Sequence, residues 1–190
     1  MPDLEIEVKY RTDIPKWMFE EIIEREYSYL LKDKIDVYYK DYYFYSPGDF
    51  SHSMRLREEY KKLTLTFKEE KEDNFMREEI NIPLKENKDS VDNIKKIAKN
   101  FLGKINSFFI VKRSVIYITD LIEISWYQVN HKDIFIELEW KGKENEGEKK
   151  LAQIDKTFVQ LMSLLPEKVS LTREFRSLFN IYGIPLLSKD

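Results

Sequence analysis

The stretch LEIEVKY at residues 4–10 alternates apolar and charged side chains. In a β-strand, successive side chains point to opposite faces, so one face of this segment would be apolar. The other face would carry two carboxylates and an amine, from Glu5, Glu7 and Lys9. We therefore predict a strand whose charged face either meets solvent or lines the inside of a closed sheet.

The chain has 190 residues, which suits a single domain over residues 1–190. No apolar run approaches the roughly 20 residues that cross a bilayer, and the first residues do not have the pattern of a leader peptide. The absence of cysteine excludes disulfides and thiol chemistry. We expect a cytoplasmic monomer or homodimer that does not bind membranes.

The net charge is −3, from 32 basic and 35 acidic residues. General nucleic-acid binding relies on an excess of Lys and Arg, so this class of function is not expected. The five glycines are too far apart to form a phosphate-binding loop. Any bound phosphate would therefore have to be held by side chains.

Eight segments have the composition or alternation of strands. They are residues 4–10, 35–45, 53–60, 63–70, 75–83, 105–118, 121–129 and 133–142. Helices are predicted at 11–27, with Thr12 or Asp13 as the cap, and at 89–103, 148–166 and 173–179. We expect an α+β protein, in which an eight-stranded antiparallel closed β-barrel has helices packed on its outside.

Charges of one sign recur along single strands. Arg55 and Arg57 alternate with apolar residues on one strand, and Glu137 and Glu139 do so on another. A one-sided sheet with its polar face in water would also alternate. However, like charges two residues apart repel each other unless a ligand of opposite sign lies between them. The predicted helices also need the apolar face of the strands, which leaves the charged face for the inside of a barrel.

Such an interior would suit a metal with a phosphate chain. Four converging carboxylates need a cation, and oxygen ligands favour Mg²⁺ or Mn²⁺. Basic side chains would grip an anion with many oxygens, with two hydrogen bonds each in the arginine case. The candidate metal ligands are Glu5, Glu7, Glu137 and Glu139, and the candidate phosphate ligands are Arg55, Arg57, Lys68 and Arg113.

Six short motifs, in order along the chain, resemble those of the CYTH group, the triphosphate tunnel metalloenzymes. They are EIEVK, MRLR, LTFK, MREEI, VKRS and FIELE, at residues 5–9, 54–57, 65–68, 76–80, 111–114 and 135–139. The group includes thiamine triphosphatases, inorganic triphosphatases and class IV adenylyl cyclases. The resemblance covers nearly the whole chain and implies an eight-stranded antiparallel tunnel with charged residues inside.

The resemblance also implies roles for single residues. Glu5, Glu7 and Lys9 would be catalytic, and Lys9 would contact phosphate or poise the attacking water. Arg173 would replace a basic residue of the closing helix, and Lys112 is a rival to Arg113. The full implied phosphate-binding set is Lys9, Arg55, Arg57, Lys68, Arg113 and Arg173, with Glu79 nearby, and the metal ligands are the four glutamates named above.

One position departs from the pattern of the group. Its members place an aspartate near the end of the seventh strand, where this chain has Tyr127. A tyrosine hydroxyl is protonated at neutral pH and is a poor ligand for hard metals. Either another acid such as Asp133 substitutes, or a second metal binds weakly.

We therefore expect a metal-dependent triphosphatase with Mg²⁺ or Mn²⁺ as cofactor. Its partner would be a small molecule that contains triphosphate: inorganic triphosphate first, nucleoside or thiamine triphosphate next. An adenylyl cyclase, a non-catalytic binder of polyphosphate or nucleotide, and a structural barrel with a solvated charged face are the alternatives.

Overall fold

A computed structural model of the chain describes residues 3–47, 52–60, 62–70, 76–84, 90–120, 122–142, 152, 154, 156–157, 159–161 and 163–183. Within these ranges the side chains of residues 3–5, 52, 68–70, 76–79, 90 and 141–142 are not described. The predicted positions that fall outside the description include the side chains of Glu5, Lys68 and Glu79.

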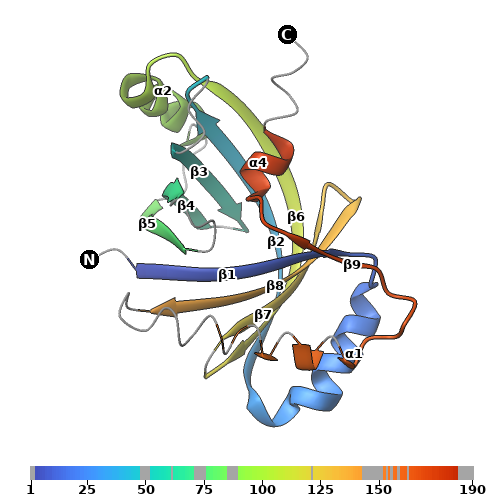
Figure 1. Cartoon of the computed structure of the whole chain (residues 1–190). Helices are drawn as coiled ribbons and strands as arrows, with labels where there is room; N and C mark the ends of the chain where they lie inside the picture. The colour runs from blue at the N-terminus through green and yellow to red at the C-terminus, as the bar shows by residue number, and fades with distance from the viewer. Residues whose placement is uncertain are drawn as a thin grey trace.

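The strands of the described residues form one antiparallel sheet. They are β1 (Asp3–Thr12), β2 (Leu31–Tyr45), β3 (His52–Glu59), β4 (Lys62–Glu70), β5 (Met76–Leu84), β6 (Asn106–Thr119), β7 (Glu123–Val129), β8 (Asp133–Gly142) and β9 (Leu171–Glu174). Their order is β5-β4-β3-β2-β6-β7-β8-β1-β9, and β5 also pairs with β1. Strands β1 to β8 are thus linked in a ring in which each strand has two neighbours (Figure 1).

Strand β1 is the seam of this ring. Its residues 4–12 pair with β8 along one edge. Along the other edge, residues 3–6 pair with β5 and residues 9–12 pair with β9. The predicted α+β antiparallel tunnel is confirmed, with two differences from the closed eight-stranded barrel that was expected. The sheet has a ninth strand, and it is not fully closed, because β1 and β5 pair only over residues 3–6 and 76–79.

This ninth strand corrects the prediction of a helix at 173–179. The backbone from Leu171 to Glu174 is a strand, and the helix α4 begins later, at Leu178, and ends at Tyr182. Backbone pairing with β1 holds the first part extended. Ser177 then caps α4, because its hydroxyl oxygen accepts a hydrogen bond from the backbone N–H of Asn180.

The longer helices are α1 (Lys16–Tyr27) and α2 (Ser90–Leu102), and a 3-10 turn, η1 (Ser28–Leu30), follows α1. The predicted cap of α1 is wrong: Pro15 is the N-cap residue, and Thr12 instead accepts a hydrogen bond from the backbone of Ile14. Gly103, with φ +76°, ends α2 as predicted. The described positions at 152–161 are also helical, within the predicted 148–166 helix.

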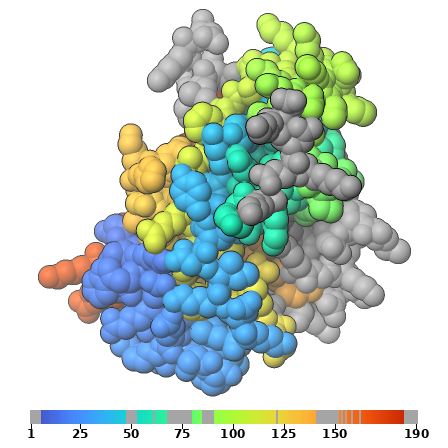
Figure 2. All heavy atoms as spheres, turned by 180° about the vertical axis from the view of Figure 1, so that it is seen from behind, coloured from blue at the N-terminus to red at the C-terminus, as the bar shows by residue number. Residues whose placement is uncertain are grey.

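Two apolar clusters lie on the outer face of the ring, under the helices. In one, α1 and the described residues Ile154 and Leu161 cover apolar side chains of β1, β6, β7 and β8. In the other, α2 covers apolar side chains of β2, β3 and β4. Seen from behind, β2 runs along the surface as the lighter blue band (Figure 2), and its residues 32–36 are exposed.

A third apolar cluster lies on the opposite face of the strands. Leu178, Phe179 and Ile181 of α4 pack against Tyr43, Tyr45 and neighbouring residues of β6, β7 and β8. The short helix therefore covers one end of the space that the strands surround. None of the described helices is both long and apolar enough to span a bilayer.

Candidate functional site

Among the predicted charged residues whose side chains the structure describes, Glu7, Lys9, Arg55, Arg57, Glu137 and Glu139 share the face of the sheet opposite to α1 and α2. We call this the inner face. The register supports it, because Glu7 pairs with Glu139, and Lys9 with Glu137, across β1 and β8. The apolar neighbours Ile6 and Val8 are buried in the outer cluster, at 1% exposure each. Alternation in LEIEVKY thus places Glu7 and Lys9 inside.

One side of the inner face is acidic. The ammonium group of Lys9 is buried, forms an ion pair with Glu7 and lies 3.6 Å from Oε2 of Glu137. Glu139 is half-buried beside Glu7. Lys9 therefore offsets part of the charge of three neighbouring carboxylates and leaves a net negative charge on β1 and β8.

Tyr127 lies on the same face, and its hydroxyl is a hydrogen-bond donor to one of the acids. Its hydroxyl donates a 2.8 Å hydrogen bond to Oε2 of Glu137. Burial first, and then the charges of Glu137 and Glu7, raise the pKa of Tyr127 well above its usual value. The hydroxyl stays protonated at neutral pH. Tyr127 thus orients Glu137 by donating to it, which a carboxylate at this position would not do.

The opposite side of the inner face is basic. Arg55 and Arg57 project from β3, and the buried Lys112 projects from β6 with its ammonium 3.7 Å from the centre of the Tyr127 ring. Burial lowers the pKa of Lys112 to about 8, and nearby Arg57 and Arg55 act in the same direction, against Glu137 and Asp41. At neutral pH, Lys112 still carries its proton.

Asp41 is a buried acid within this basic group. It is on β2, opposite Arg57 in the register, and its side chain is 0% exposed. Its two carboxylate oxygens accept hydrogen bonds from Nε and Nη2 of Arg57, each 2.8 Å long. Burial alone would raise the pKa of Asp41, but the charge and hydrogen bonds of Arg57, with Arg55 and Lys112, lower it to about 2.

A polar ladder extends from the basic side into β4 and β5. Arg55 donates a 3.3 Å hydrogen bond to the hydroxyl of Thr66, and Thr66 donates to Asn81 at 2.7 Å. The backbone of Lys68 pairs with that of Glu79 one step further along. The side chains of these last two predicted residues lie outside the described part of the chain.

Two predicted basic residues do not join the inner face. Arg113 is exposed on the other face of β6, one residue away from the buried Lys112. The structure therefore places Lys112 in the position for which Arg113 was expected. Arg173 lies over the rings of Tyr10 and Phe175, at 5.9 and 5.3 Å from the ring centres. The pairing of Tyr10 with Arg173 sets both residues on the face opposite to Lys9.

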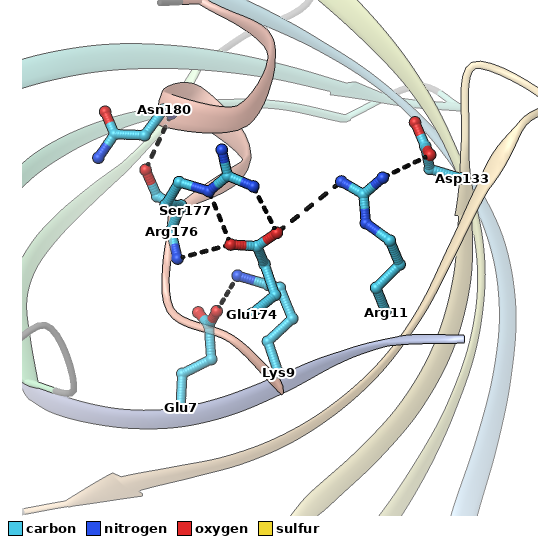
Figure 3. Close-up of polar contacts among 8 residues, drawn as sticks. All are labelled: Glu7, Lys9, Arg11, Asp133, Glu174, Arg176, Ser177 and Asn180. Atoms are coloured by element: carbon cyan, nitrogen blue, oxygen red, sulfur yellow. Dashed lines mark hydrogen bonds and ion pairs between the residues drawn. The ribbon is translucent and has the colours of Figure 1, made fainter. Parts of the chain in front are cut away.

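The segment that follows β9 brings a different arginine to the acidic side. Glu174 pairs with Lys9 in the register, and Arg176 donates to both carboxylate oxygens of Glu174, at 2.8 and 2.9 Å. Arg11 links Glu174, at 3.8 Å, to Asp133, at 3.0 Å. Figure 3 shows this chain of charges above Lys9 and Glu7.

Asp133, the acid considered as a substitute for the aspartate of the seventh strand, is bound on both oxygens by other side chains. Its two oxygens accept hydrogen bonds from Arg11, at 3.0 Å, and from the hydroxyl of Tyr182 in α4, at 2.7 Å. It thereby ties the C-terminal segment to the β7–β8 hairpin.

The donor set on β1 and β8 fits a hard divalent cation in its chemistry. Glu7, Glu137 and Glu139 offer only carboxylate oxygens, the ligands that Mg²⁺ and Mn²⁺ prefer. The described side chains contain no group of three acidic or histidine residues close enough together to enclose a metal, and the side chain of Glu5 is not among them. Glu7 and Glu139 are direct register partners across β1 and β8.

The sequence analysis missed Asp41 and Arg176. Asp41 lies in a run rich in tyrosine, and its partner Arg57 is distant in the sequence. The signal that could have found it is parity, because Asp41 alternates with the apolar residues Tyr42 and Phe44 that pack under α2. Arg176 follows a strand that was predicted as helix, so its direction was not predictable.

Comparison with known proteins supports one family. The sequence model of the CYTH domain matches residues 3–175. No curated protein matches the chain. Among solved structures, a protein from Pyrococcus horikoshii is 19% identical with a TM-score of 0.68, covering 91% of this chain and 96% of its own. A second protein from that organism is 23% identical with a TM-score of 0.65, covering 98% and 99%.

A further neighbour carries an activity in its description. An adenylyl cyclase-like protein from Hippeastrum, described as revealing a dominant triphosphatase activity, is 13% identical with a TM-score of 0.61. The match covers 95% of this chain and 96% of that one. At these identities the likeness establishes the fold.

Proposed function

Because the chain belongs to the CYTH domain family, we propose that it is a metal-dependent triphosphatase that hydrolyses short phosphate chains, inorganic triphosphate first. Nucleoside and thiamine triphosphate are the next candidates. The observation that carries the proposal is the sorting of charge on the inner face, where acids gather on β1 and β8 and basic residues gather on β3 and β6. A metal–triphosphate complex carries both signs of charge and complements both sides.

The basic side would hold the phosphate chain. Arg55, Arg57 and Lys112 offer guanidinium and ammonium donors on a mostly buried face, where charge-assisted hydrogen bonds are strongest. Hydrolysis transfers the terminal phosphoryl group to water, so the bond from its phosphorus to the bridging oxygen breaks. Negative charge then moves onto the pyrophosphate that leaves. Fixed cations along the chain stabilise that charge without rearrangement.

The acidic side would hold the cofactor. Glu7, Glu137 and Glu139, with Glu5 expected from the EIEVK motif, are the proposed ligands for Mg²⁺ or Mn²⁺. When bound, such a cation would lower the charge on the phosphate oxygens and acidify a water molecule. Lys9, held between Glu7 and Glu137, would orient a phosphate oxygen or the attacking water. Tyr127 would keep Glu137 in place through its hydroxyl.

Product analysis tests the proposal directly. The purified protein is given inorganic triphosphate or ATP with Mg²⁺ or Mn²⁺, and orthophosphate, pyrophosphate and cyclic AMP are resolved. We expect orthophosphate and pyrophosphate from inorganic triphosphate. Cyclic AMP from ATP would instead assign the protein as a cyclase, and binding without any product would assign it as a polyphosphate binder.

Two variants test the assigned acids. Glu7→Gln and Glu137→Gln should each reduce turnover at least a hundredfold, since either change removes a charge from the proposed metal site, while circular dichroism stays unchanged. Glu58→Gln, an exposed acid on β3, is the matched control and should keep full activity. Turnover that survives both of the first two changes would contradict the assignment.

A further inference from the structure

Asp41 and Arg57 form a buried ion pair on the inner face, and both carboxylate oxygens of Asp41 take part in it. Both oxygens of Asp41 are engaged by Arg57, through Nε and Nη2, at 2.8 Å each. This is the two-bond geometry that fixes the plane of a guanidinium as well as its position. Asp41 is wholly buried, so water does not compete for its oxygens.

A ring fixes the same guanidinium from a second direction. The central carbon of Arg57 lies 4.2 Å from the centre of the Tyr39 ring, which is itself buried. A guanidinium has five N–H bonds, of which Asp41 receives two along the Nε–Nη2 edge. The edge formed by Nη1 and Nη2 is a second donor fork, and it is not the edge that Asp41 occupies.

Stability alone is a weak reason for this pair. Removing two charges from water costs several kcal/mol per ion, and a well-packed apolar pair of the same volume is often as stable or more stable. The positive charge near Asp41 also exceeds its own single negative charge, because Arg55 and Lys112 act on its carboxylate in addition to Arg57. A single acid among three cations leaves the group net positive while it fixes one member.

We propose that Asp41 is a positioning residue for the phosphate chain: it holds Arg57 so that the remaining donor edge of the guanidinium is presented to the bound anion. Asp41 does not touch the substrate and acts through Arg57. This inference rests on the proposed function, since it takes a short polyphosphate as the anion. On the basic side, Arg57 would then bind the anion in an orientation fixed by Asp41, and Arg55 and Lys112 would bind it without that constraint.

Calorimetric titration with sodium tripolyphosphate, in EDTA and without metal, isolates this role from turnover. Asp41→Asn should raise the dissociation constant about tenfold. The asparagine amide offers Arg57 only one acceptor oxygen, and its NH₂ group would face an N–H of the guanidinium. Arg57→Lys keeps the charge and loses the fork, so it should weaken binding to a similar extent. The double variant should bind no more than about twofold more weakly than either single variant, because both act through the same contact.

Matched controls separate positioning from structure and from charge. Glu58→Gln removes an exposed acid of β3, next in sequence to Arg57, and should leave the dissociation constant unchanged. A structural role would lower the melting temperature of Asp41→Asn with unaltered affinity, and that result would overturn the inference. Tighter binding in Asp41→Asn would overturn it as well, since it would show that Asp41 only repels the anion.

Arg57→Lys keeps the inference testable if Asp41→Asn does not fold. An unchanged dissociation constant in Arg57→Lys would overturn it. Failure of the wild-type protein to bind tripolyphosphate both in EDTA and with Mg²⁺ present would instead remove the proposed function, and with it the premise of this inference. The two failures are therefore distinguishable in one set of titrations.

Discussion

At the scale of single residues, the neighbours Lys112 and Arg113 offer the sharpest comparison in the molecule. Both are basic and adjacent on β6, but the first is buried on the inner face and the second is exposed on the outer face. Lys112→Met should raise the dissociation constant for triphosphate by ten- to a hundredfold, the usual cost of losing a charge-assisted contact. Arg113→Met should change it less than twofold.

Titration calorimetry of the two variants checks this expectation. Equal losses in Lys112→Met and Arg113→Met would contradict the assignment of Lys112 to the phosphate chain. Circular dichroism of both variants shows whether the fold is retained, so that a loss of affinity is not mistaken for unfolding.

Asp41 makes a prediction about acid stability. Its pKa in the folded protein is lowered to about 2 by the charge of Arg57 and its other basic neighbours, which outweighs the effect of burial. The unfolded chain therefore binds the proton first as the pH falls. The stabilisation from Asp41 is complete above about pH 5 and is lost as the pH falls towards 2.

The size of this effect follows from the same linkage. Between pH 5 and pH 3, the wild-type free energy of unfolding should fall by about 1 kcal/mol more than that of Asp41→Asn. Urea unfolding at the two pH values measures it, with Glu58→Gln as the reference substitution. Parallel pH dependence in the wild type and Asp41→Asn would contradict a lowered pKa at this position.

Alternation in the sequence was sufficient to place some inner-face residues and insufficient for others. Lys9, Arg57 and Glu137 lie on strands with a clean apolar side, so parity decides their direction. On β6, apolar residues flank Lys112 and Arg113 on both sides, so parity does not decide between them. The register with β2 and β7 decides, and register depends on residues far away in the sequence.

At the scale of elements, the contact of α4 with β6 can be tested at Gly183, which follows the helix. A methyl group built at Gly183 would lie 2.6 Å from Cε1 of Phe108 and 2.7 Å from the backbone oxygen of Phe179. Gly183→Ala should therefore cost about 1 to 3 kcal/mol through overpacking. Thr172→Ala, an exposed position on β9, should change the free energy of unfolding by less than about 0.5 kcal/mol.

Urea midpoints of the two variants give the comparison. If Gly183→Ala were as stable as Thr172→Ala, α4 would not be packed against Phe108 in solution. The triphosphatase assay of Gly183→Ala then reports whether the cover that α4 forms over one end of the inner face affects turnover.

The elements also show where local sequence signals fail. The tyrosine-rich strand, the helices α1 and α2 and the β7–β8 hairpin were all predicted, because each has its own periodicity or turn residues. The segment Leu171–Glu174 reads equally well as the start of a helix. It is a strand because the open edge of β1 supplies backbone partners, and a tertiary contact of that kind has no signal in the four residues themselves.

At the scale of the whole molecule, ligand binding should appear as thermal stability. Tripolyphosphate at about 100 times its dissociation constant should add roughly 2.7 kcal/mol to the free energy of unfolding. For a protein of this size, the melting temperature then rises by very roughly 5 to 10 °C. Differential scanning fluorimetry measures the shift, with sodium sulfate at equal ionic strength as the control. A shift no larger than that with sulfate would argue for a barrel whose charged face only meets solvent.

The pairing of β1 also sets an order of assembly during synthesis. On the ribosome, β1 emerges before every strand with which it pairs, and its partners lie at residues 76–79, 134–142 and 171–174. The hairpins between β3 and β5 and between β6 and β8 need only nearby partners and can form early. The strand that carries Glu7 and Lys9 thus waits longest for its hydrogen bonds, because long-range pairing is the slow part of building a sheet. The ring of strands around the inner face is therefore complete only after β8, the last of its eight strands to be synthesised, has paired with β1.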